Sequence, residues 1–156
     1  GRKDLMSLIG GGPVVHPGTY NGNALVTAAA RGTLSILARG DAYETIERAG
    51  GRLISGFGSL LRERGIRGNV QGVPGSFNVH LGSDNPVATF ADTAALDGAA
   101  TARLVMALQV RGIRAISGGH FYTNASHTDE LVDETLNAFE DDDRDVVEVL
   151  RRGPEH

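Results

Sequence analysis

A proline–glycine turn between two short runs of strand-like sequence is the feature that most constrains the fold of this chain. The second run, Ser76 to Leu81, alternates apolar and polar residues, as a half-buried antiparallel strand does. The first run, Gly68 to Val73, leads directly into the turn Pro74-Gly75. We therefore expect a β-hairpin here. The 22 glycines of the chain also argue against a helical bundle.

Helical patterns stand on both sides of this hairpin. Apolar residues recur at helical spacing, and capping residues or glycines mark the expected helix ends. The expected helices cover residues 4–9, 24–38, 41–65 and 88–112, the last of these broken or kinked near Gly98, and a final helix begins at Thr128. Two further short strands are expected at Ile113–Ser117 and His120–Asn124, around Gly118-Gly119. Short antiparallel strands covered by helices on one face predict an α+β fold.

Two of these helices have unusual compositions. The helix over residues 24–38 carries small side chains nearly all round, which predicts close packing against neighbours. The helix over residues 41–65 contains Gly50-Gly51, and each glycine costs roughly 1 kcal/mol relative to alanine. Close approach of another backbone is one reason to tolerate that cost.

The composition excludes several classes of function. A chain of 156 residues with 40% hydrophobic and 22% charged residues is an ordinary globular sequence. The net charge of −4 and the scattered basic residues give no footprint for nucleic acid. No apolar run approaches the length of a membrane span, and without cysteine there is no disulfide or thiolate metal site. We expect a cytoplasmic protein without nucleic-acid or membrane partners.

The chain, read alone, contains no complete active site. It has no nucleophile elbow, no Walker loop and no dinucleotide fingerprint. Its histidines show no i,i+4 pairing with a carboxylate helper, so we expect no metal site. These histidines are His16, His80, His120, His127 and His156. In the acidic run Glu140–Asp145, the residues Glu140–Asp143 are typical of a solvated face, and Val146–Leu150 predicts a final turn or two of helix.

The turn Gly18-Thr19-Tyr20-Asn21-Gly22-Asn23 precedes the alanine-rich helix and has the composition of an anion site. Asn21 or Asn23 can cap the helix, which leaves backbone N–H groups and the Thr19 hydroxyl as donors. A helix start after a glycine-containing turn readily binds phosphate. The alternative is a capped turn that binds nothing.

The segment Gly18 to Leu25 resembles the G-T-[YLF]-[SN]-G-N-P-[LV] motif of class III aminotransferases, pyridoxal-phosphate enzymes of fold type I. The glutamate-1-semialdehyde 2,1-aminomutase branch is the nearest in pattern, although Ala24 stands where proline is usual. Further segments are similar to family segments in the same order, over roughly residues 1–140. They are Gly1–Met6, the long helix Tyr43–Gly65, the strand Val73–Val79, and Ala125–Glu130 at the start of the last helix.

The resemblance implies the C-terminal part of such an enzyme. Residues 1–40 would be the end of the large domain, residues 41–140 the small domain and residues 141–156 a tail. In the family, the threonine of the motif binds the phosphate of the partner subunit's pyridoxal 5'-phosphate. Here that residue is Thr19, supported by Gly18. The implied partner is a second copy, in a homodimer, or a companion large-domain chain.

Catalytic residues are not expected within this sequence. The resemblance places the lysine that forms the Schiff base upstream of Gly1, and Lys3 lies in a different motif. A small amino-acid or amine substrate is implied. Gly118, Gly119, His120 and Tyr122 are candidates to line the mouth of the active site, with a plain hairpin as the alternative. The carboxylate-binding arginine of some relatives has no counterpart in His120–Asn124, and Arg114 is the nearest arginine.

Two other interpretations remain open. The chain could be a non-catalytic interaction or regulatory module that keeps the fold without the chemistry. It could also be a stand-alone phosphate-binding domain.

Overall fold

The computed structural model describes residues 1–10 and 13–140, and the chain divides into two compact units. The first unit is Gly1–Arg39 and the second is Gly40–His156. The predicted final helix turns at Val146–Leu150, and the acidic run beyond Glu140, lie outside the described residues. Within the described ranges, no helix has the length and apolar character needed to cross a membrane.

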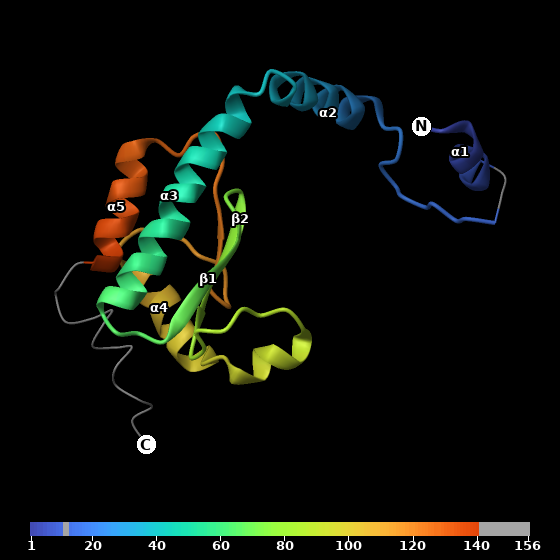
Figure 1. The fold of residues 1–156 in the computed structure, drawn as a ribbon. Coiled ribbons are helices and arrows are strands. Elements are labelled where there is room, and N and C mark those ends of the chain that lie inside the picture. Colours follow the sequence, from blue (N-terminus) through green and yellow to red (C-terminus); the bar gives the residue numbers. More distant parts are fainter. Residues whose placement is uncertain (11–12, 141–156) are drawn as a thin grey trace. The chain divides into compact units, whose positions relative to one another are not determined.

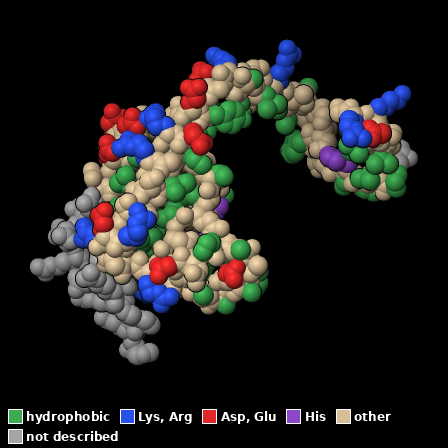
Figure 2. Space-filling model, viewed as in Figure 1, with side chains coloured by type: hydrophobic (Ala, Val, Ile, Leu, Met, Phe, Trp, Pro, Cys, Tyr) green, Lys and Arg blue, Asp and Glu red, His purple; other side chains and the backbone are tan. Residues whose placement is uncertain are grey.

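The first unit contains two helices, α1 (Lys3–Ile9) and α2 (Ala24–Leu37) (Figure 1). Asn23, one of the two predicted caps, begins α2: its Oδ1 accepts hydrogen bonds from the N–H groups of Leu25 and Val26, at 3.0 and 3.2 Å. Within the described chain, α2 buries none of its side chains. Hydrophobic side chains of α2 are open to solvent (Figure 2), and Leu25 is 81% exposed.

The second unit is a three-stranded antiparallel sheet packed against helices (Figure 1). The strands are β1 (Gly68–Val73), β2 (Ser76–Leu81) and β3 (His120–Tyr122), in the order β1-β2-β3. The helices are α3 (Asp41–Glu63), the 3₁₀ helix η1 (Phe90–Ala95), α4 (Gly98–Val110) and α5 (Asp129–Glu140). The predicted hairpin and the predicted α+β class are confirmed.

The core joins the sheet to α3 and α5 through four phenylalanines. Phe77 of β2 and Phe121 of β3 are paired across the strands and stack, with ring centroids 5.3 Å apart and planes 4° from parallel. The ring centroid of Phe57 in α3 lies 5.1 Å from the ring centroid of Phe121 and 5.1 Å from that of Phe139 in α5. Such pairs contribute about 0.5–1.5 kcal/mol each beyond the area that they bury. Phe57 thus connects β3 directly to α3 and, through Phe139, to α5.

The period of two along the strands divides the sheet into an apolar and a polar face. On the apolar face Phe77, Val79 and Leu81 are buried. The opposite face carries the polar side chains, which the register places side by side across the three strands. They are Asn69 and Gln71 of β1, Ser76, Asn78 and His80 of β2, and His120 and Tyr122 of β3.

Gly50 allows the hairpin turn to contact α3 directly. A Cβ at this position would overlap the carbonyl group of Pro74, so only glycine fits. The Thr123 hydroxyl holds the same turn, donating a hydrogen bond to the Pro74 carbonyl at 2.5 Å. The predicted close approach of a second backbone is thus confirmed at Gly50. Nothing lies within 4 Å of a Cβ built at Gly51.

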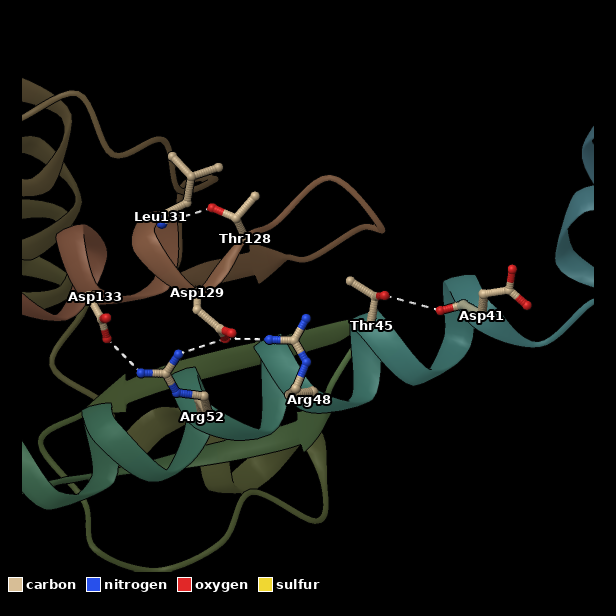
Figure 3. Close-up of polar contacts among 8 residues, drawn as sticks. All are labelled: Asp41, Thr45, Arg48, Arg52, Thr128, Asp129, Leu131 and Asp133. Atoms are coloured by element: carbon tan, nitrogen blue, oxygen red, sulfur yellow. Dashed lines mark hydrogen bonds and ion pairs between the residues drawn. The ribbon is translucent and has the colours of Figure 1, made fainter.

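Ion pairs connect the exposed sides of α3 and α5 (Figure 3). The Arg52 guanidinium contacts the Asp129 carboxylate at 2.8 Å and the Asp133 carboxylate at 2.5 Å, and Arg48 also pairs with Asp129. Asp133 and then Asp129 raise the pKa of Arg52. Because these side chains are about half exposed, solvent screens the pairs and their contribution to stability is small.

The predicted break near Gly98 is confirmed, because η1 ends at Ala95 and α4 begins at Gly98. Asp92 accepts hydrogen bonds from the N–H groups of Ala88 and Thr89, which starts η1 separately. The N–H of Asp97 donates to the Leu81 carbonyl at 2.8 Å, and the Asp97 carboxylate caps α4. Attachment to the sheet at Asp97 therefore breaks the predicted helix.

The prediction of a strand at Ile113–Ser117 is wrong. Within the described chain it is reduced to one bridge, between Ile116 and His120. Gly118 and Gly119, which lie between the two bridged residues, have φ of 86° and 76° and reverse the chain there. The strand predicted at His120–Asn124 forms, but it ends at Tyr122.

The two neighbouring glycines of α3 provide a matched test of the hairpin contact. Gly50→Ala should lower the free energy of unfolding by about 1–3 kcal/mol, because its methyl group has no room beside Pro74. Gly51→Ala should leave it unchanged or raise it by up to about 1 kcal/mol. Urea unfolding followed by circular dichroism measures both. Equal effects of the two substitutions would contradict the contact.

The Asn23 cap can be tested against its neighbour Asn21. Asn23→Ala should cost about 1 kcal/mol of helix stability and speed amide exchange at Leu25 and Val26 severalfold, since their acceptor is lost. Asn21→Ala should leave exchange at both amides unchanged. Hydrogen exchange followed by NMR gives the answer. Fast exchange at these amides in the unsubstituted chain would show that the cap does not form.

Candidate functional site

The turn before α2 is built from two successive backbone hydrogen bonds. The Gly18 carbonyl accepts from the N–H of Asn21, and the Tyr20 carbonyl accepts from the N–H of Asn23, both at 3.0 Å. Gly22 has a φ of 77°, a conformation that side-chain-bearing residues rarely adopt. The sequence therefore forms a compact, fully exposed loop that ends at the helix cap.

The cap decides which donors this turn can offer to a ligand. The Asn23 side chain accepts hydrogen bonds from the N–H groups of Leu25 and Val26, so these two donors are already occupied. Within the described part of the chain, the Thr19 hydroxyl and the N–H groups of Thr19, Tyr20 and Gly22 have no protein partner. A phosphate at this place would be bound mainly by the turn around Thr19 rather than by the end of the helix.

Gly18 and Asn21 shape the turn and do not cap α2. A Cβ at Gly18 would come within 2.5 Å of the Asn21 carboxamide. That carboxamide hydrogen-bonds the His16 ring at Nδ1, at 3.0 Å, and the His16 carbonyl, at 3.4 Å. Asn21, the other predicted cap, therefore attaches the turn to the preceding segment. Sequence reasoning gave His16 no part in this turn, because its contact with Asn21 depends on the turn closing.

The second unit contains an open groove beside β3, with a volume of about 620 Å³. His120 and Tyr122, the two candidate substrate residues, both line it. Its apolar wall includes Phe121 and Leu131, and its polar rim includes Glu134. The groove is therefore large enough for a small organic molecule.

Three basic residues also line this groove. Arg114, which the sequence suggested as the nearest arginine, lies there together with Arg111 and His127. Sequence reasoning missed Arg111 and His127, because they follow a helix end and precede another helix without any motif that joins them. The groove is thus richer in positive than in negative side chains.

Gly118 and Gly119 do not line the groove. They form the tight turn before β3, and the Gly119 carbonyl accepts a hydrogen bond from the N–H of Val79 at 2.9 Å. A Cβ at Gly119 would overlap the Val79 carbonyl group. For these two glycines, the alternative of a hairpin packing role is the one that the structure supports.

His80 and Asn69 face each other across β1 and β2. Burial lowers the pKa of His80. The Nδ1 atom of His80 and the Oδ1 atom of Asn69 are buried and have no hydrogen-bond partner among the residues that the structure describes. Among the described residues no cluster of histidines and carboxylates could hold a metal ion.

Comparison with known proteins shows what the chain is similar to. No protein-family model matches it. The chain is 32% identical over 157 residues to the glutamate-1-semialdehyde 2,1-aminomutase of Roseiflexus castenholzii, an alignment that covers 98% of this chain and 36% of that protein. The chain thus spans about a third of the length of this curated relative.

Solved structures show the same fold. An omega-transaminase from Sphaerobacter thermophilus superimposes with a TM-score of 0.77 at 24% identity, over 97% of this chain and 35% of the transaminase. A transaminase solved with PLP bound gives a TM-score of 0.78 at 22% identity, over 97% of this chain and 35% of its own. At this level of identity, the likeness establishes the fold.

These matches confirm the resemblance inferred from the motifs. Over nearly its whole length, the chain is similar to part of a glutamate-1-semialdehyde 2,1-aminomutase, and its fold is similar to part of solved transaminases.

Proposed function

We propose that this chain is the C-terminal part of a pyridoxal-phosphate-dependent aminotransferase or aminomutase. Its contribution is a phosphate anchor at Thr19 and a small domain that covers the substrate. The single observation that carries the proposal is the turn around Thr19. This turn is exposed, and its hydrogen-bond donors have no partner in the described chain. The sequence that contains it aligns with an aminomutase over 98% of its length.

The residues present fit the phosphate of the cofactor. The Thr19 hydroxyl and neighbouring backbone N–H groups are donors, and phosphate oxygens are strong acceptors. The absence of a Cβ at Gly18 lets the turn close on Asn21. No basic side chain belongs to this turn, so binding would depend on hydrogen bonds rather than on a nearby cation.

When bound, pyridoxal phosphate supplies the electron sink for amino-group chemistry. The anchor turn would hold the phosphate and so orient the cofactor. In the second unit, the groove beside β3 would accept part of a small amino acid or amine, with His120 and Tyr122 facing it. In this proposal the chain supplies groups that bind cofactor and substrate. The catalytic lysine of the amino-group chemistry would come from elsewhere.

That second source is a lysine-bearing segment or chain. Lys3 is the single lysine of the sequence, and it lies exposed at the first position of α1 rather than in either candidate site. The exposed apolar side chains of α2 are consistent with packing against another part of the enzyme. The proposed assembly is a cytoplasmic homodimer, or a complex with a companion chain.

The second candidate is a non-catalytic interaction or regulatory module of the same fold. The observation that favours it is the lack of any lysine other than Lys3 in the sequence. Binding of pyridoxal phosphate by the assembly, followed by its absorbance, separates the two candidates, since such a module would bind none.

Replacement of Thr19 tests the anchor. In the assembled enzyme, Thr19→Ala should raise the dissociation constant for pyridoxal phosphate about tenfold to a hundredfold, the effect of losing one hydrogen bond to a charged group. Thr19→Ser keeps the hydroxyl and should retain most of the affinity. Cofactor titration followed by absorbance measures both.

The exposed position of Thr19 provides the control. The urea midpoint should be the same in both variants, because no protein contact of the side chain is lost. An unchanged cofactor affinity in Thr19→Ala would remove Thr19 from the site.

A further inference from the structure

Three side chains of the polar sheet face form one cluster at the groove. The Ser76 hydroxyl lies 2.9 Å from the Nε2 atom of His120. The ring of His120 lies against the ring of Tyr122, with centroids 4.4 Å apart and planes 35° from parallel. The register pairs Ser76 of β2 directly with Tyr122 of β3. The His120 ring is therefore held by the hydroxyl at one nitrogen and by the Tyr122 ring on one side.

The hydrogen-bonding capacity of Ser76 decides where the His120 proton lies. Within the described residues, His120 is the hydrogen-bond partner of the Ser76 hydroxyl. A partly buried hydroxyl proton needs an acceptor, and the neutral imidazole accepts at the nitrogen that carries no proton. If the Ser76 hydroxyl donates to Nε2, the proton of neutral His120 is on Nδ1. That atom has no hydrogen-bond partner among the described residues.

We propose that Ser76 is a positioning residue: it holds His120 with the proton on Nδ1, so that Nδ1–H donates to an oxygen atom of the molecule in the groove. The inference rests on the proposed function, which makes that molecule an amino-acid substrate. It deepens the function by assigning His120 a defined role, as a donor to a carboxylate or carbonyl oxygen. Tyr122 limits the rotation of the ring.

The surroundings of His120 fit an oxygen acceptor. Arg111, Arg114 and His127 line the same groove, and Glu134 is the acidic residue among its described lining. Such a set of donors and positive charges attracts an anionic or carbonyl oxygen rather than an ammonium group. His120 is itself partly buried, which strengthens a hydrogen bond there relative to bulk water.

Nitrogen-15 NMR of the full chain tests the tautomer, at a pH where the ring is neutral. Spectra that correlate ring nitrogens with ring carbon-bound protons distinguish a protonated from a bare nitrogen. The expected result is one dominant form of His120 with the proton on Nδ1. Ser76→Ala should change this to a mixture, whereas Ser76→Thr should restore the dominant form. The His127 signals should stay the same in all three proteins.

A purely structural role for Ser76 predicts otherwise. The tautomer of His120 would then be the same in the Ser76→Ala variant, and the positioning role would be overturned. If Ser76→Ala also loses the His127 signals, that variant is unfolded and Ser76→Thr provides the test. A His120 proton on Nε2 in folded Ser76→Thr would contradict the proposal.

Titration with acetate tests the donor role separately. Added acetate should shift the His120 Nδ1 signal in the unsubstituted chain and in Ser76→Thr, and at least threefold less in Ser76→Ala. No shift in the unsubstituted chain would refute the donor role. Neither experiment contains pyridoxal phosphate, so failure of the cofactor proposal would be seen only in the Thr19 titration.

Discussion

The stacked pair Phe77–Phe121 is the interaction on which the rest of the second unit depends. It joins the middle strand to β3, and Phe57 connects the same pair to α3 and, through Phe139, to α5. Because β3 has three residues, its few ladder bonds alone would hold it weakly. The aromatic cluster compensates, and it fixes the two residues that flank Phe121 on the opposite face. Those residues, His120 and Tyr122, are the ones that line the groove.

The sequence predicted the elements whose signals are local. The β-hairpin follows from the alternation of Ser76–Leu81 and from the Pro74-Gly75 turn, and the Gly50 contact follows from the cost of a glycine within a helix. The sequence also indicated a break or kink near Gly98, but not its cause, which is the hydrogen bond from the Asp97 N–H to the Leu81 carbonyl in the sheet. The groove was not predictable from local signals, because residues far apart in the sequence line it.

The resemblance to class III aminotransferases carried the functional interpretation further than the residues alone. Geometry then refined it: Asn23 uses two helix N–H groups, so the proposed phosphate donors are those of the Thr19 turn. The turn belongs to the first unit and the groove to the second. Under the proposed function both candidate sites would supply binding groups, and neither of them contains a lysine.

The central claim is that Thr19 anchors the cofactor phosphate while another segment supplies the lysine. A crystal structure of the assembled enzyme with pyridoxal phosphate tests it most directly. The account predicts the Thr19 hydroxyl at about 2.7–3.0 Å from a phosphate oxygen, and a lysine from outside these 156 residues at the cofactor. A phosphate bound away from the Gly18–Asn23 turn, or Lys3 at the cofactor, would contradict it.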